Sequence, residues 1–198
     1  MMRVVISEFV TLDGVFEDPG GVEGFPHGGW AFGYERGPEG DRFKLDEIVE
    51  AEALLLGRKT YEGFADAWPS RTDDSGFADT MNGIRKYVAS GTLGQADWSH
   101  STVLSGDLMD QVRQLVGRGS GILLVVGSGS IVRQLVSHGL VDEIRLMVFP
   151  TVLGAGATLL EGTDHSREFS IRDLQRFGAT ALVTLDRNGS IPPTTEAA

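Results

Sequence analysis

The chain has 198 residues, of which 41% are hydrophobic and 23% are charged, a balance typical of a soluble globular protein with one well-formed core. Its formal net charge of −11 argues against nucleic acid or an anionic membrane surface as the main partner. It has no cysteine, which excludes disulfides, thiolate chemistry and cysteine-ligated zinc. No apolar run approaches the roughly 20 residues of a membrane span and no signal-peptide layout precedes the first strand, so we expect a cytoplasmic protein without a membrane partner.

Alternating strand-like and helix-like segments predict an α/β protein. Short apolar, β-branched runs indicate strands, and runs with apolar residues three or four apart indicate helices. The expected strands are 3–10, 53–56, 86–90, 102–104, 122–126, 143–149, 169–174 and 180–186. The expected helices are 41–52, one that starts at Thr60, 77–84, 108–116 and 131–137. This order predicts a sheet covered on both faces, with a final antiparallel pair of strands.

These elements form a single predicted domain over residues 1–190, because no internal repeat or linker divides them. A Pro/Thr/Ala-rich tail follows at 191–198, and we expect it to be disordered. Residues 15–30 form a glycine- and aromatic-rich loop without periodicity. We favour a binding loop or lid for this segment over a surface loop whose aromatic side chains only seal the edge of the core.

A strand, a glycine, two cations and a helix start meet in the segment ALLLGRKTYEGF at 53–64. Its first four residues indicate a strand buried on both faces of a sheet. Gly57 permits a sharp turn, Arg58 and Lys59 follow at once, and Thr60 is the expected N-cap of the next helix. In an α/β protein such a junction can hold a phosphate. The alternative is an ordinary strand–turn–helix with two solvated cations.

A second glycine-rich turn, GSGS at 127–130, links the buried strand 122–126 to a helix. Glycines let a ligand approach the backbone, and the unpaired N–H groups of a first helical turn attract an anion. The turn does not match the Gly-x-Gly-x-x-Gly dinucleotide fingerprint, because Val132 replaces the third glycine, and Gly57 lacks the upstream glycine of a P-loop. A capped helix without a ligand is the alternative.

The sequence offers no metal site and no unambiguous catalytic group. The four histidines stand alone, and the Gly-x-Ser-x-Gly elbow of serine hydrolases does not occur. Asp13 and Asp41 are the candidate catalytic carboxylates, because either could donate a proton if burial raised its pKa. Their simpler roles are those of a turn residue and a helix N-cap.

Taken together, these segments resemble the dihydrofolate reductase-like superfamily. Residues 53–61 look like its strand-Gly-Arg-x-Thr segment, and 125–130 resemble its glycine-rich cofactor loop. Residues 7–14, which end in Thr-Leu-Asp-Gly, and 142–156 are similar to the C-terminal reductase domain of the bacterial riboflavin-biosynthesis deaminase-reductase, here in a stand-alone form. The resemblance runs in order from about residue 3 to residue 187, whereas the deaminase half is missing.

The resemblance implies a three-layer α/β/α sandwich on a mixed, mostly parallel central sheet that binds NADPH at the carboxyl ends of its strands. It implies that two clusters hold the cofactor phosphates, where paired cations would suit a 2′-phosphate. These cofactor residues are Gly57, Arg58, Lys59, Thr60, Ser90, Gly127, Ser128, Gly129 and Ser130. The first strand end and the aromatic loop would face nicotinamide and substrate. The implied substrate contacts are Ser7, Thr11, Gly14, Trp30, Tyr61 and Phe64.

The implied activity is hydride transfer from NADPH to a C=N or C=O bond of a small heterocyclic substrate, similar to the 5-amino-6-(5-phosphoribosylamino)uracil reductase step of riboflavin biosynthesis. One alternative is a non-catalytic nucleotide-binding regulatory or interaction protein on the same fold. Another is a true dihydrofolate reductase, since Asp41 falls near the proton-donating carboxylate of those enzymes; the Thr-Leu-Asp-Gly pattern and Phe149-Pro150 weaken this alternative. The resemblance also implies that the protein forms a homodimer. It further implies that the substrate is a small molecule.

Overall fold

A computed structural model describes residues 1–163 and 166–188 of the chain, so the predicted tail at 191–198 and the end of the predicted domain lie outside the described residues. The strands are β1 (Arg3–Thr11), β2 (Ala51–Gly57), β3 (Arg85–Ala89), β4 (Ser101–Leu104), β5 (Ile122–Val126), β6 (Glu143–Phe149), β7 (Phe169–Phe177) and β8 (Thr180–Arg187). The helices are α1 (Gly37–Glu50), α2 (Arg58–Ala67), α3 (Phe77–Gly83), α4 (Leu108–Arg118) and α5 (Gly129–Ser137), with a short 3₁₀ turn, η1, at Trp30–Gly33.

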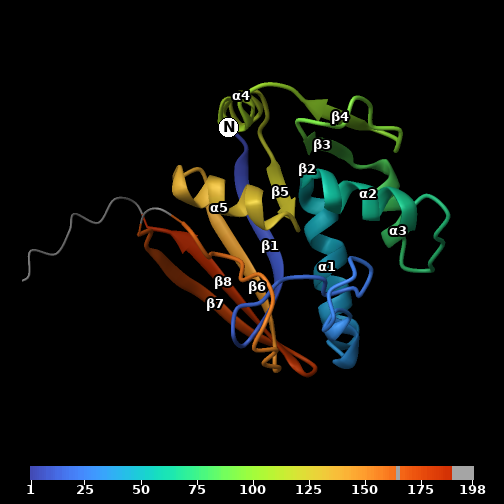
Figure 1. Ribbon diagram of the computed structural model, residues 1–198, viewed down its shortest axis with the longest axis vertical. Helices are drawn as coiled ribbons and strands as arrows, with labels where there is room; N and C mark the ends of the chain where they lie inside the picture. The colour runs from blue at the N-terminus through green and yellow to red at the C-terminus, as the bar shows by residue number, and fades with distance from the viewer. Residues whose placement is uncertain (164–165, 189–198) are drawn as a thin grey trace, which may run out of the picture.

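The strands form one eight-stranded sheet in the order β4-β3-β2-β5-β1-β6-β8-β7 (Figure 1). β1 lies between β5 and β6 and runs parallel to both. β8 runs antiparallel to both of its neighbours, β6 and β7. The sheet is therefore mixed and mostly parallel, which confirms the predicted α/β fold and the predicted antiparallel pair at its end.

Helices pack on both faces of this sheet (Figure 1). α4 and α5 lie on one face, where Val112 and Leu135 join Leu55 of β2 in one buried apolar cluster. α1, α2 and α3 lie on the opposite face, and residues of all three join Leu54 in a second cluster. Because successive strand side chains point to opposite faces, residues 53–56 feed both clusters, and each is 0% exposed. This confirms the three-layer sandwich and the strand buried on both faces.

Two predicted helix caps are wrong. α1 begins at Gly37 rather than Asp41, because Pro38 occupies its first turn, where the missing N–H and the fixed φ of proline favour helix initiation. Asp41 lies inside the helix. α2 begins at Arg58, and its N-cap is Gly57 without a side-chain cap hydrogen bond. Thr60 therefore lies in the first turn, where its hydroxyl makes a contact outside its own helix.

The strand order places two switch points beside β5. The chain leaves the carboxyl ends of β1 and β2 toward the face that carries α1 and α2, but it leaves β5 toward the opposite face through α5. β5 lies between β2 and β1, so the connections change direction on each side of its carboxyl end. Open α/β sheets bind their ligands at such points. The fold thus directs attention to the carboxyl ends of β2, β5 and β1.

Candidate functional site

Ser128 joins the starts of α2 and α5. Its Oγ accepts a hydrogen bond from the backbone N–H of Gly57 at 2.7 Å and lies 2.8 Å from Oγ1 of Thr60. The contact needs glycine on both sides: a Cβ added to Gly57 would lie 2.6 Å from Ser128 Oγ, and one added to Gly127 would lie 2.7 Å from Thr60 Oγ1. The two turns that the sequence marks as phosphate sites therefore lie side by side, at the carboxyl ends of β2 and β5.

The chemistry of this junction suits an anion. The starts of two helices meet here, and the first turn of a helix carries unpaired N–H groups and the positive end of the helix dipole. Arg58 and Lys59 are the first residues of α2, and both are exposed. Arg58 lies 3.1 Å from Glu62, a surface pair that an incoming anion can displace because such pairs contribute little free energy. Ser130 is exposed in the first turn of α5.

The remaining predicted cofactor residues lie at the edges of this junction. Ser90 follows Ala89, which pairs with Gly57 across β3 and β2, so Ser90 lies at the neighbouring strand end. Its Oγ accepts two backbone N–H groups of the turn that follows. Gly129 is buried under Phe16, whose ring would lie 2.2 Å from an added Cβ. Phe16 therefore brings the glycine-rich loop after β1 onto the start of α5.

Glu8 of β1 was not found by sequence reasoning. Ser7 pairs with Val126, the last residue of β5, so Glu8 lies opposite Gly127. Glu8 is 6% exposed, and its Oε1 has no hydrogen-bond partner within the described chain. Burial raises the pKa of Glu8 to about 8, against the opposing effects of the Lys44 ammonium and the Gly127 N–H. No spacing pattern marks this residue, because in the sequence it is one polar position in a strand.

Ser7, a predicted substrate residue, belongs to a buried charged cluster beneath α1. Its Oγ donates to Oε2 of Glu47 at 2.9 Å and accepts from Nζ of Lys44 at 2.7 Å. Lys44 and Glu47 are 2.5 Å apart, and Glu47 also lies 3.3 Å from Arg145. The Lys44 ammonium lies 5.1 Å from the ring centroid of Phe9. Lys44 and Glu47 could not be predicted from the sequence as neighbours of Ser7. The packing of α1 over β1 brings them there.

Thr11, Asp13 and Gly14 form a tight turn that anchors the loop at 151–156. Asp13 accepts the Thr11 hydroxyl at 2.5 Å and the backbone N–H of Gly154 at 2.8 Å. These hydrogen bonds, that of Thr11 first, lower the pKa of Asp13. The condition for its predicted role as a proton donor, a pKa raised by burial, is not met, and the simpler role of a turn residue fits the geometry.

Asp41 lacks the surroundings of a buried acid as well. Its side chain is 65% exposed, and its Oδ1 lies 2.6 Å from Nε of Arg36. This is a surface ion pair at the start of α1. The structure therefore gives no support to Asp41 as a proton donor.

Tyr61 and Phe64 share a face of α2, as predicted, but that face packs into the core. Tyr61 is 4% exposed, and its hydroxyl accepts the backbone N–H of Trp98 at 2.9 Å. Phe64 packs edge-on against Trp68, with ring centroids 6.4 Å apart. Both residues hold α2 on the sheet, so they are not part of the site that we propose.

The loop that connects β1 to α1 is ordered by its own contacts. Asp18 is 2% exposed and accepts three backbone N–H groups of the loop at 2.7 to 3.2 Å. Trp30 is 7% exposed and packs edge-on against Phe149, with centroids 5.3 Å apart. Trp30 therefore seals the edge of the core, which was the alternative to a substrate contact. Sequence reasoning did not identify Asp18 as the residue that organises the loop.

Comparison with known proteins decides the family. A family model described as the RibD C-terminal domain matches residues 3–183. The chain belongs to the RibD C-terminal domain family. One relative, the uncharacterized protein YyaP of Bacillus subtilis (strain 168), is 25% identical over 160 residues, which cover 79% of each protein.

Solved structures share the fold of this RibD-family chain. A candidate riboflavin biosynthesis protein from Shewanella sp. PV-4 superposes with a TM-score of 0.75 at 19% identity, covering 95% of this chain and 100% of the other. Dihydrofolate reductase from Enterococcus faecalis, in complex with NADP(H) and RAB-propyl, superposes with a TM-score of 0.57 at 14% identity, covering 94% and 97%. At these identities the likeness shows the fold alone, and it confirms the predicted dihydrofolate reductase-like architecture.

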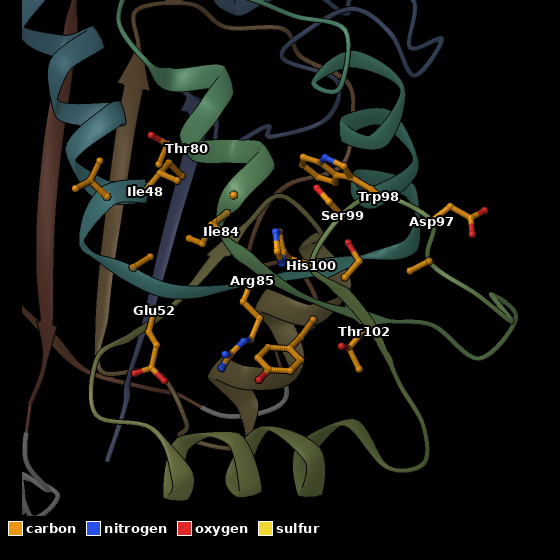
Figure 2. Close-up of a pocket in the computed structure, with 16 residues that line it drawn as sticks. Ile48, Glu52, Thr80, Ile84, Arg85, Asp97, Trp98, Ser99, His100 and Thr102 are labelled. Atoms are coloured by element: carbon orange, nitrogen blue, oxygen red, sulfur yellow. The ribbon is translucent and has the colours of Figure 1, made fainter.

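A separate cavity of about 1040 Å³ lies at the amino ends of β2, β3 and β4 (Figure 2). Glu52 and Arg85 line it at the starts of β2 and β3, and Trp98 and His100 line it from the segment before β4. None of the predicted site residues lines this cavity. It lies at the amino ends of the strands, whereas switch-point crevices open at the carboxyl ends. We therefore place the candidate site at the carboxyl ends of β2, β5 and β1 rather than in this cavity.

Two further properties concern the described part of the chain alone. Residues 1–163 and 166–188 bring together no group of three histidine, aspartate or glutamate side chains that could hold a metal ion. Across the same ranges, none of the helices has the length and apolar character needed to cross a bilayer.

Proposed function

We propose that the protein is an NADPH-dependent reductase of the RibD C-terminal domain family that acts on a C=N or C=O bond of a small heterocyclic substrate. The observation that supports this proposal most strongly is the contact through which Ser128 joins the starts of α2 and α5. Two helix N-termini that meet at a switch point suit a ligand with more than one phosphate. The glycines at 57 and 127 fit this role, since a side chain at either position would fill the junction.

Arg58 and Lys59 support the 2′-phosphorylated form of the dinucleotide. Both cations start α2 at the edge of the junction. A guanidinium binds a phosphate through two hydrogen bonds and an ammonium adds a point charge, so NADPH gains contacts here that NADH lacks. When bound, the dinucleotide supplies the hydride, while the chain binds and orients the two reactants.

The α1 side of β1 supports the substrate half of the proposal. The Lys44 ammonium lies next to the ring of Phe9 and donates to the Ser7 hydroxyl, which in turn donates to Glu47. An aromatic ring and polar groups suit a flat heterocycle with hydrogen-bonding edges. A phosphoribosylamino-pyrimidine has this chemistry, with a phosphate that a cation can attract.

Titration of the purified protein with NADPH and NADH tests the proposal. We expect saturable binding, tighter for NADPH, because a charge-assisted contact with the 2′-phosphate adds roughly 1.5–3 kcal/mol, about tenfold or more in affinity. Arg58→Ala or Lys59→Ala should remove most of this preference. Arg113→Ala is the matched control, because Arg113 forms a comparable surface pair with Asp110 on α4. If neither nucleotide binds the wild-type protein, the proposal fails.

Turnover separates a reductase from a protein that only binds nucleotide. NADPH oxidation should be followed with the phosphoribosylamino-pyrimidine intermediate, with dihydrofolate and with simple cyclic imines. We expect oxidation with the pyrimidine or an imine. Tight NADPH binding without oxidation by any of these acceptors would favour the non-catalytic alternative.

A further inference from the structure

Glu8 lies where β1 and β5 separate. The two strands pair in parallel up to Ser7 and Val126, and β5 ends there as the chain turns away toward α5. β1 continues to Thr11, paired on its other side with β6. Beyond this register β1 has lost its partner on the β5 side, and Glu8 is its first residue there.

Glu8 differs from the other buried carboxylates of the described chain. Glu47 is paired with Lys44 and Arg145, and Glu143 with Arg3, Arg145 and Arg172. Asp18 accepts three backbone N–H groups. Glu8 is equally enclosed, yet its Oε1 has no partner. An unpaired buried polar atom is unfavourable, so its persistence where the strands separate suggests that the partner comes from a ligand.

We propose that Glu8 is a ligand-contacting residue at the switch point between β1 and β5, and that its protonated carboxyl group hydrogen-bonds the carboxamide of the nicotinamide ring. This inference rests on the proposed function. A carboxylic acid and a primary carboxamide each carry one donor and one acceptor side by side, so they pair through two hydrogen bonds.

The neighbours of Glu8 favour its neutral form. β6 contributes Leu146, which pairs with Glu8 across the sheet, and the turn after β5 contributes the N–H of Gly127. From α1, the Lys44 ammonium lowers the pKa of Glu8 and the Glu47 carboxylate raises it, but burial dominates and brings it to about 8. Arg133 of α5 instead donates to backbone carbonyls in the 158–159 segment. A neutral carboxyl group avoids repulsion of the phosphates at the adjacent turn.

The test is the pH dependence of NADPH affinity between pH 7 and pH 9.5, where the ligand phosphates are already ionised. If only protonated Glu8 makes the contact, wild-type affinity should fall by about tenfold or more as the pH rises through a pKa of about 8. Glu8→Gln should bind within about threefold of wild type at pH 7 and show no such fall, because its amide stays neutral and still donates. Glu8→Leu should bind at least about tenfold more weakly at pH 7, since both hydrogen bonds are lost.

Glu52→Gln is the matched control. Glu52 lies at the amino end of β2, at the opposite end of the strand from Gly57, and accepts the N–H groups of Ser120 and Gly121. The variant should keep the wild-type pH profile. Lys86 also titrates near pH 8, since burial lowers its pKa to about 8, but Glu8→Gln retains Lys86, so a flat profile in that variant assigns the effect to Glu8.

Three outcomes would overturn the inference: a flat wild-type profile, an unchanged profile in Glu8→Gln, or wild-type affinity in a folded Glu8→Leu protein. Thermal unfolding of each variant establishes that it is folded. Absence of NADPH binding by wild type at every pH would instead contradict the proposed function itself.

Discussion

Four buried carboxylates in the described chain show how the same side-chain chemistry is assigned different roles by its surroundings. Glu47 and Glu143 are held by cations, and Asp18 is held by backbone N–H groups. Glu8 has neither kind of partner for its Oε1. Because a buried carboxylate with an unpartnered oxygen is costly, burial favours the neutral acid at Glu8.

The pKa of Glu8 predicts a pH-dependent stability. It rises from 4.5 in the unfolded chain to about 8 in the fold, so between these values the folded state binds more protons, and the free energy of unfolding falls as pH rises. Glu8→Gln stays neutral and should match wild type near pH 4.5 but exceed it by about 3–5 kcal/mol at pH 9. Urea unfolding at pH 5, 7 and 9 measures this difference. A difference that does not change with pH would contradict the buried-acid assignment.

The sequence indicated some residues of the proposed site but not others. Arg58 and Lys59 were candidates because they follow a buried strand and a glycine within one short segment. Glu8 and Lys44 could not, because their importance depends on strand register and on the packing of α1 over β1. Asp13 and Asp41 were candidates by residue type, but contacts and exposure, which a sequence does not carry, decide whether a carboxylate is a proton donor.

The proposed site depends on two strand–helix units, β2–α2 and β5–α5, which meet through the hydroxyl of Ser128. Gly57 and Gly127 allow β2–α2 and β5–α5 to approach until Ser128 and Thr60 touch. Both units could be located from the sequence, since each has a buried strand followed by glycine. Their mutual contact and the start of α1 at Gly37 could not, because Thr60 and Asp41 resemble ordinary N-cap residues.

Gly57→Ala tests this junction. The new Cβ would lie 2.6 Å from Ser128 Oγ and 3.0 Å from its Cβ, so α5 must move away from α2. We expect a loss of about 1–3 kcal/mol in stability and at least about tenfold weaker NADPH binding. Ser128→Gly in the same chain should recover part of the stability because it removes the clash.

Gly63→Ala serves as the control for Gly57→Ala. Gly63 lies in α2 with open space around it, so alanine should stabilise the helix by about 0.5–1 kcal/mol and leave NADPH binding unchanged. Equal effects of the two substitutions on binding would show that the junction is not required.

The order of the strands in the sheet explains why the proposed site lies at the carboxyl ends of β2, β5 and β1. Fold class and the final antiparallel pair followed from the pattern of segments, but the order of strands did not. That order sets β5 between β2 and β1 and so creates the two switch points. It also leaves β7 at the edge of the sheet, with Ile171 60% and Leu174 63% exposed.

We propose that a second copy of the chain covers this edge and so forms the homodimer expected from the sequence resemblance. An edge strand with exposed apolar side chains can pair with its own copy about a twofold axis. Sedimentation should show a dimer for wild type and a monomer for Leu174→Lys. Val49→Lys, a similarly exposed position on α1, should remain dimeric. A wild-type monomer at high micromolar concentration would contradict the proposal.

A crystal structure of the protein with NADP⁺ would show where the dinucleotide binds. We expect the 2′-phosphate against Arg58 and Lys59, the pyrophosphate at the turn 127–130, and the carboxamide within hydrogen-bond distance of Glu8. A dinucleotide seated at the amino ends of the strands, in the cavity between Arg85 and His100, would contradict this expectation.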